Sequence, residues 1–212
     1  MHSTRTKRRT LQPRRKPTQE RSRQRVDAIL DATARLLERE GVEGVSTRHI
    51  ADEAAVPVGS LYQFFPNKFA ILNALSRRHI ERYGHEVFGR IPPMDSEFCW
   101  EVWLDHVIDA TTVFLFSEKA ICVLWAAMQH VTELKTIETE AMTKAMDGVT
   151  EALGRIVPTL PDERAAKLAW MITTVTRAVL FDASYSEPAQ RAAKIAELKR
   201  LLRSYVADNV AC

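Results

Sequence analysis

Apolar residues recur every three to four positions along most of the chain from residue 19 onward, which is the spacing that places side chains on one face of an α-helix. The first such stripe predicts a helix over residues 21–40 that ends at Gly41. Further stripes lie at 58–64, 68–85, 97–116 and 118–157, and two more open at Pro161 and Pro188. The sequence therefore predicts an all-α fold.

Length and composition narrow the class of protein. A chain of 212 residues, of which 46% are hydrophobic, can bury a core without disulfides or metals, as one large domain or two small ones. This composition excludes collagen-like and wholly disordered chains, and no apolar run approaches the roughly 18 residues that span a bilayer. Cys99, Cys122 and Cys212 form no C-x-x-C pair and no zinc-like spacing with histidine. We therefore expect no cofactor and, without a secretory signal, a cytoplasmic location.

Positive charge is concentrated at the N-terminal end. Residues 1–25 carry ten Lys and Arg side chains against the single acid Glu20, and residues 1–80 carry 16 basic and 8 acidic side chains, against 14 and 19 in the rest of the chain. This asymmetry favours a polyanionic partner, because each cation laid on a phosphate releases condensed counterions. Residues 1–18 fit a solvated tail, a transit peptide or a nucleic-acid arm. We expect the arm, since the segment lacks the apolar face of a transit peptide and its prolines keep it extended.

Two short helices joined by a tight turn are predicted within residues 46–64. Ser46 is a typical N-cap, Ala55-Val56-Pro57 forms the turn, and Pro66-Asn67 caps a further helix that begins near Lys68. This is the arrangement of a helix-turn-helix, although such pairs also arise by chance in all-α proteins. The second helix carries small and polar residues that suit a DNA groove better than a core, namely Gly59, Ser60, Tyr62 and Gln63.

The run from Ser46 to Lys68 resembles the DNA-binding signature of the TetR/AcrR family of bacterial transcriptional regulators. The resemblance rests on Ile50-Ala51, Gly59-Ser60-Leu61-Tyr62, Phe65 and Pro66-Asn67-Lys68, which all fall in register. It extends over about residues 21–75, and the rest of the chain is similar to the family only in length and helical character. One position departs from the pattern. The turn residue that is usually glycine in this family is Ala55, for which a left-handed conformation costs about 1 kcal/mol, so either the turn differs slightly or packing offsets the strain.

The resemblance implies that residues 58–64 form the recognition helix. Its exposed side would face base edges, and Gln63 is the side chain best able to pair with adenine. Phe64 would either touch a sugar or thymine methyl group or fill the core. The residues that the resemblance places at base edges are Val58, Gly59, Ser60 and Gln63, and Phe64 is a further candidate DNA contact.

A second group of residues is implied to bind the DNA backbone. Ser46 or Thr47 would bind a phosphate at a helix N-terminus, and Arg48 would reach a phosphate or a guanine edge. Tyr62 and Lys68 would grip phosphates. Taken alone, Tyr62 would be as well explained as a packing aromatic and Lys68 as a solvated helix start.

The C-terminal helices offer a dimer interface. A recognition helix reads only a few base pairs, so specific binding needs two copies about one DNA turn, roughly 34–36 Å, apart. The family resemblance implies a four-helix bundle made of two helices from each subunit. The apolar stripes are Leu168, Ile172, Val175 and Val179, and Ile195, Leu198, Leu202 and Tyr205 or Val206. The same stripes would suit packing within one chain, and the sequence does not distinguish the two.

Aromatic and methionine side chains are concentrated between residues 95 and 157. Such density is typical of a plain core and also of an apolar cavity with a few polar groups, here His106, Gln129, His130 and Thr174. The family's ligand cavities favour the second interpretation, with a small hydrophobic or aromatic effector. The predicted lining residues are Trp103, Val107, Trp125, Met128 and Met171.

These observations predict a basic arm (1–20), a helix-turn-helix domain (21–67), a connecting helix (68–90) and a ligand-binding and dimerisation domain (91–212). The expected function is that of a homodimeric repressor that an effector releases from a palindromic operator. An activator, a regulator without an effector and, remotely, a membrane-surface protein anchored by its arm are the alternatives; the arm lacks the apolar face that a membrane requires. We expect no enzyme, because no catalytic motif is complete: an H-E-x-x-H at His85-Glu86 fails at Gly89.

Overall fold

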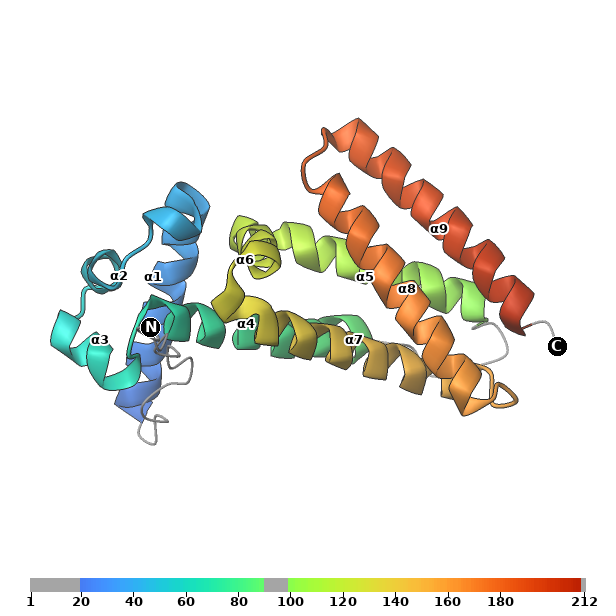
Figure 1. The fold of residues 1–212 in the computed structure, drawn as a ribbon, viewed down its shortest axis with the longest axis horizontal. Coiled ribbons are helices and arrows are strands. Elements are labelled where there is room, and N and C mark those ends of the chain that lie inside the picture. Colours follow the sequence, from blue (N-terminus) through green and yellow to red (C-terminus); the bar gives the residue numbers. More distant parts are fainter. Residues whose placement is uncertain (1–19, 90–98, 211–212) are drawn as a thin grey trace, which may run out of the picture. The chain divides into compact units, whose positions relative to one another are not determined.

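The computed structural model describes residues 20–89 and 99–210, and every regular element within these ranges is a helix (Figure 1). The predicted all-α fold is confirmed. Nearly all of the predicted arm, and Cys212, lie outside the described residues. In chain order the elements are α1 (Glu20–Gly44), α2 (Thr47–Glu53), α3 (Val58–Phe64), α4 (Lys68–Tyr83), the π-helix η1 (Gly84–Phe88), α5 (Trp100–Ser117), α6 (Lys119–His130), the 3₁₀-helix η2 (Thr132–Leu134), α7 (Lys135–Ile156), α8 (Asp162–Ala183) and α9 (Pro188–Val210).

The helices group into two compact units. Unit 1 holds the described residues up to His79 together with Val123–Glu138, and unit 2 holds Ile80–Cys122 and the described residues from Thr139 onward. Residues 123–138 therefore group with unit 1, although the sequence pattern placed them with the C-terminal helices.

Short local signals set the ends of the first helices. The backbone of α1 leaves the helical conformation at the predicted Gly41, where φ is +68°, before one more turn that ends at Gly44. The Ser46 side chain caps α2 by accepting the His49 N–H at 3.2 Å. The Asn67 side chain caps α4 by accepting the Ala70 N–H at 3.0 Å. Each cap satisfies a backbone donor that a helix start leaves unpaired, which is why these boundaries could be predicted.

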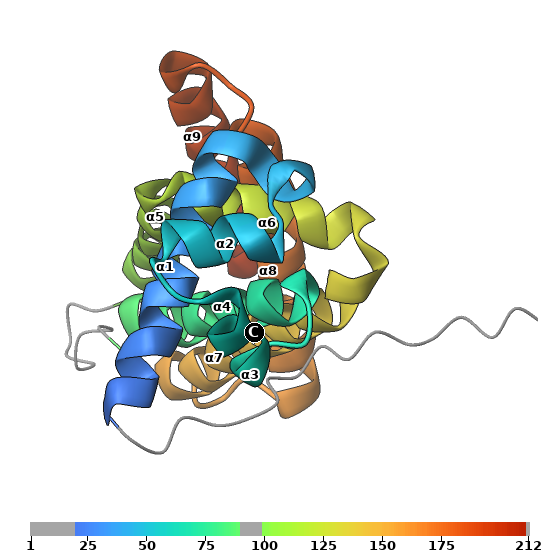
Figure 2. The ribbon, with the colours of Figure 1, turned by 90° about the vertical axis from the view of Figure 1, so that its left-hand side faces the viewer.

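The core of unit 1 fixes two helices that could not persist alone. α2 and α3 each have seven residues, too few for a stable isolated helix in water. They are held because Ile50 of α2 and Leu61 of α3 are fully buried, as are Ile29 and Leu37 of α1. Burying each such side chain stabilises a fold by about 1.5–3 kcal/mol. Figure 2 views this unit from the side on which α2 and α3 face the reader.

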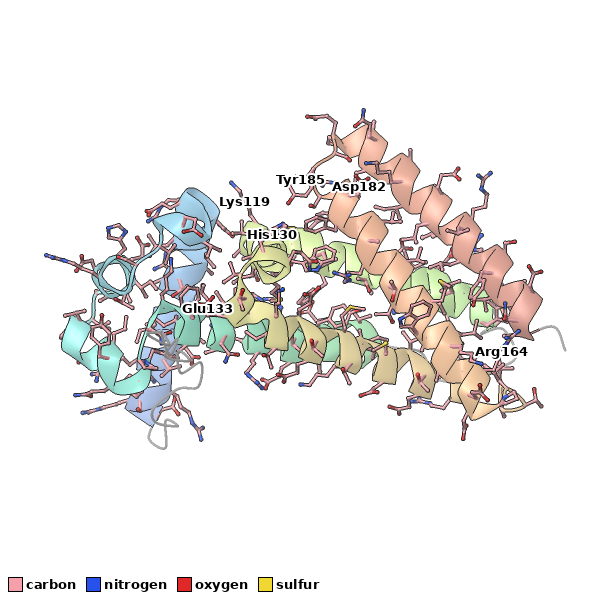
Figure 3. The ribbon with its side chains drawn as sticks, viewed as in Figure 1. Lys119, His130, Glu133, Arg164, Asp182 and Tyr185 are labelled. Carbon is pink, nitrogen blue, oxygen red and sulfur yellow. The ribbon has the colours of Figure 1, made fainter. Side chains whose placement is uncertain are left out.

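In unit 2, α8 and α9 run antiparallel and side by side (Figure 1). Lys194 of α9 forms an ion pair with Asp182, which Figure 3 labels near the end of α8. Helix α5 is tied to α9 by hydrogen bonds from Arg203 to Asp105 and by the ion pair of Lys199 with Asp109, 2.6 Å long.

The apolar stripes that the sequence offered as a dimer interface lie largely inside unit 2. Leu168 and Ile172 of α8 and Leu198 and Leu202 of α9 are buried within their own chain. The large apolar side chains that α8 and α9 leave exposed are different ones, Trp170 at 54% and Leu201 at 57%. Periodicity identified buried faces correctly, but it could not say which molecule buries them.

Two predicted helices are interrupted. The long pattern over residues 118–157 breaks at Val131, whose backbone is extended, and a 3₁₀ turn then leads into α7. The connecting helix changes at Tyr83 from α-helix to the π-helix η1. Over a few residues, apolar side chains spaced three to four positions apart are compatible with an α-helix, a 3₁₀-helix or a π-helix. Periodicity alone therefore did not predict where the helix type changes.

Candidate nucleic-acid interface

The turn between α2 and α3 contains a residue in the left-handed conformation, at the position where the resembled family usually has glycine. Ala55 has φ +52°. Its N–H donates to the Asp52 carbonyl at 3.1 Å, and the next N–H, that of Val56, donates to the Ala51 carbonyl at 3.0 Å. These paired bonds form a Schellman motif, in which glycine is the usual left-handed residue. The turn geometry is therefore retained, and the alanine bears the strain.

An ion-pair network holds α2 to α1 directly before this turn. Glu53, the last residue of α2, accepts hydrogen bonds from Arg35 Nε and Arg39 Nη2, each at 2.8 Å. These bonds, that of Arg39 first, lower the pKa of Glu53 to about 2, so the carboxylate is ionised at neutral pH. The sequence analysis did not identify this network. Its only signal was the pair of arginines four residues apart on α1, and that spacing does not name a partner.

The exposed side of α3 and the start of α2 form a mixed polar and apolar surface. Arg48 and Gln63 are exposed, and Val58 is 45% exposed although it is apolar. The hydroxyl groups of Thr47 and Tyr62 are hydrogen-bonded across the two helices at 2.9 Å. Ser46 and Ser60, also predicted DNA contacts, are half-buried.

Gly59 lies on this surface, and no contact within its own chain requires a glycine there. A Cβ atom added there would have no atom within 4 Å, and its φ is not in the left-handed region. Neither backbone conformation nor internal packing therefore requires glycine. Its small size would affect only the approach of a molecule outside the chain.

Lys68 is more constrained than a solvated helix start. Its Nζ atom donates to the Val42 carbonyl at 3.2 Å and lies 5.6 Å from the centre of the Phe69 ring. The side chain is half-buried. An ammonium group has three donors, so this bond leaves hydrogen-bonding capacity for a phosphate.

Phe64 does not belong to the exposed surface. Only 4% of its surface is accessible, and it lies three residues after the fully buried Leu61, on the same side of α3. The interpretation of Phe64 as core is therefore the one that the structure supports, and we do not retain it as a DNA contact.

The five residues predicted to line an effector cavity are divided between the units. Trp103 and Val107 of α5 are buried and Met171 of α8 is half-buried, all in unit 2. Trp125 and Met128 of α6 belong to unit 1.

Helices α5 and α8 of unit 2 contain buried side-chain polar atoms that have no hydrogen-bond partner among the described residues. They include Trp103 Nε1, His106 Nε2, Thr173 Oγ1 and Thr176 Oγ1. Leaving such an atom unpaired costs about 1–3 kcal/mol. His106 was predicted as a polar group of a cavity, whereas the two threonines carry no sequence signal that separates them from other helical threonines.

Helix α9 contacts both of the helices that carry these atoms. Arg203 and Lys199 of α9 pair with Asp105 and Asp109 of α5. The same stretch of α9 forms a groove with the part of α8 around Ala178. Residues 105–109 of α5 and 178–182 of α8 therefore both lie beside the middle turns of α9.

Across 20–89 and 99–210, no three His, Cys, Asp or Glu side chains gather in a way that could hold a metal ion. Among the helices of those ranges, none combines the length and the apolar character needed to cross a membrane.

Two family models match the chain. The model described as bacterial regulatory proteins, tetR family, matches residues 29–75, which include α2, the turn and α3. The model described as the tetracyclin repressor-like C-terminal domain matches residues 100–205, half of the chain.

Relatives and solved structures agree with these models. The chain is 39% identical over 71 residues to the HTH-type transcriptional repressor KstR of Rhodococcus jostii, and 41% identical over 63 residues to KstR of Mycobacterium tuberculosis. These matches cover 34% and 30% of this chain but only 32% and 29% of the relatives, so the chain spans about a third of the length of the curated proteins that it matches.

Similarity to solved structures extends over most of the chain. A TetR-family transcriptional regulator from Streptomyces coelicolor is 28% identical with a TM-score of 0.63, and the match covers 87% of this chain and 99% of that one. GusR of Salmonella enterica, 18% identical, shares the fold with a TM-score of 0.69 over 92% of this chain and 99% of its own.

Proposed function

Because this chain belongs to the TetR family of bacterial regulatory proteins, we propose that it is a DNA-binding transcriptional regulator and not an enzyme. Its proposed form is a cytoplasmic, homodimeric repressor that a small effector releases from a palindromic operator. The observation that carries the DNA-binding part is the exposed surface of α3 beside the hydrogen-bonded hydroxyls of Thr47 and Tyr62. The choice of repression follows the named function of the KstR relatives, which match the DNA-binding region.

Each residue of this surface that the sequence predicted to contact DNA has a proposed role. Val58, Gly59, Ser60 and Gln63 face base edges in the major groove, because they lie on the side of α3 away from the core. Arg48 reaches a guanine edge or a phosphate. Phosphates are bound by Ser46 or Thr47, Tyr62 and Lys68.

The proposed dimer interface is the exposed side of α8 and α9. These helices form an open groove lined in part by the small residues Ala178 and Ala193 and by the exposed Leu201. Trp170 is a further exposed apolar side chain on α8. A second copy that covers this side would bury them, and its own α3 would supply the second recognition helix that a palindromic operator requires.

The unpaired polar atoms of α5 and α8 support an effector site in unit 2. Trp103 and His106 on one helix and Thr173 and Thr176 on the other would gain hydrogen bonds from a bound molecule. The proposed effector therefore has a hydrophobic body and carries hydrogen-bonding groups. Val107 and Met171 would contact its apolar part, and Trp125 and Met128 stay candidates from the sequence.

Release of the operator DNA follows from thermodynamic linkage between binding of the effector and binding of the DNA. If the effector binds better to a dimer whose recognition helices are wrongly spaced, DNA weakens effector binding by the same factor by which the effector weakens DNA binding. A coupling of about 1–3 kcal/mol corresponds to roughly 5–150-fold.

Selection from a random-sequence duplex pool tests the proposal directly. We expect enrichment of an inverted repeat whose half-sites lie about one DNA turn apart. Failure to enrich any sequence would refute the DNA-binding function. A thermal-shift screen of small amphipathic compounds, followed by gel shift with the enriched duplex, tests the effector: a compound that stabilises the protein should also release the duplex.

A further inference from the structure

The strained residue of the helix-turn-helix lies two positions after the most strongly paired carboxylate of unit 1. Ala55 is the only residue other than glycine with a positive φ in the described chain. An alanine prefers to leave that conformation, because its Cβ crowds the following carbonyl oxygen. Glu53 is the last residue of α2, so its hydrogen bonds to Arg35 and Arg39 stabilise the helical turn that directly precedes Ala55.

The bonds to Glu53 oppose unwinding of that turn. Both donors, Arg35 and Arg39, lie on the regular helical stretch of α1 before Gly41, and the Glu53 side chain is only 24% exposed. If α2 frayed from its C-terminal end, Glu53 would lose both guanidinium partners. The bond from Val56 N–H to the Ala51 carbonyl, which defines the turn, would be lost with them.

We propose that Glu53 is a positioning residue for DNA recognition, which with Arg35 and Arg39 keeps Ala55 in its left-handed conformation and thereby sets the direction in which α3 leaves α2. This rests on the proposed DNA-binding function of α3. The assignment yields a specific expectation: a glycine at position 55, which adopts the same conformation without strain, makes the Glu53 network largely dispensable.

A double-mutant cycle tests the coupling. Glu53→Gln is expected to weaken binding of the duplex selected by the wild-type protein roughly 5- to 20-fold. In an Ala55→Gly background the same change should weaken binding less than about 3-fold. The two effects differ because substitutions at coupled residues are not additive, whereas those at independent residues are. Equal losses in both backgrounds, or no loss in either, would overturn the proposal. Binding is measured well below the unfolding temperature of each variant and is corrected for active fraction.

Amide hydrogen exchange supplies a readout that does not depend on DNA. Exchange of the Val56 N–H should accelerate about tenfold or more in Glu53→Gln, and much less when residue 55 is glycine. Unchanged exchange would refute the positioning role. The exchange experiment separates the proposed DNA-binding function from the positioning role of Glu53. If the wild-type protein enriches no duplex, the proposed function fails, but hydrogen exchange still tests whether Glu53 holds the turn.

Two variants guard against simpler explanations. Asp31→Asn removes the ion pair of Asp31 with Arg78, 2.8 Å long and in the same unit but away from the turn, and its effect should be the same with alanine or glycine at position 55. If Glu53→Gln does not fold, Arg35→Gln replaces it. Arg35→Gln leaves the Arg39 bond in place, so the loss of DNA affinity should be smaller, and Ala55→Gly should again reduce it. A loss of affinity that is the same with glycine at position 55 would count against the proposal.

Discussion

The hydroxyl oxygens of Thr47 on α2 and Tyr62 on α3 lie 2.9 Å apart. One hydroxyl donates to the other, which leaves a single proton free to point outward from the pair. A phosphate oxygen that accepts this proton would polarise both groups, so the pair would bind it more strongly than either hydroxyl alone.

Tyr62→Phe therefore should weaken DNA binding while leaving the fold intact. The ring stays, but one hydrogen bond worth about 0.5–1.5 kcal/mol is lost, which corresponds to roughly 2- to 13-fold in the dissociation constant. Because the hydroxyl is uncharged, the slope of affinity against salt should not change. Fluorescence anisotropy at several salt concentrations measures both quantities. Thr47→Val should give a loss of similar size, and an unaltered affinity in both variants would show that the pair does not touch DNA.

Gly59→Ala should separate stability from DNA binding. The added methyl group meets nothing in the chain, and alanine favours a helix over glycine by about 1 kcal/mol, so the melting temperature should hold or rise. Affinity for the selected duplex should fall nonetheless, since the methyl group would occupy space that the DNA approaches. A variant that gains stability and keeps full affinity would place Gly59 away from the duplex.

Lys68→Met should lower both DNA affinity and stability. Methionine retains an apolar stem beside Phe69 but removes the donor to the Val42 carbonyl and the positive charge. The loss of one phosphate contact should make the salt dependence shallower by about one unit of slope. Lys68→Arg keeps the charge and serves as the control. An unchanged salt slope would mean that Lys68 has a purely structural role.

Glu53 should make unit 1 sensitive to acid. Its pKa is lowered in the folded state to about 2 from an ordinary 4.5, so its ionised form stabilises the fold above pH 4.5 and this contribution is lost as the pH falls towards 2. Chemical denaturation of the wild type and of Glu53→Gln at a series of pH values measures the difference. The stability difference between the two proteins should shrink over that interval; a constant difference would contradict the ion-pair assignment.

Leu201→Glu should abolish dimerisation without unfolding the subunit. Leu201 is 57% exposed on α9, so a carboxylate there stays hydrated in the monomer but would be buried in the proposed interface. Sedimentation velocity should show monomers, and affinity for the palindromic duplex should collapse. Val113→Glu, at a position 70% exposed on α5, is the matched control and should remain dimeric.

Features of the first helices could be predicted from the sequence because each depends on a few neighbouring residues. Ser46 and Asn67 cap α2 and α4 through bonds that span three residues, and Gly41 ends the regular part of α1 where it was expected. At Ala55 the sequence left two possibilities, a different turn or a strained alanine, and the structure shows the left-handed alanine. The polar and small character of the exposed side of α3 could be predicted for the same reason.

Other features depend on which segments meet in space. Val58 and Phe64 are both apolar residues of α3, yet the first is 45% exposed and the second is buried, because only one side of the helix packs into the core of unit 1. The sequence by itself determined that the chain is helical, where its short helices begin and which residues could face DNA, since these follow from periodicity and capping within a few positions. Only the tertiary structure decided that Glu53 bonds to Arg35 and Arg39, that Lys68 bonds to Val42, and that Leu168, Ile172, Leu198 and Leu202 of α8 and α9 are buried within their own chain. Those contacts join residues far apart in the chain, and their geometry is set by packing.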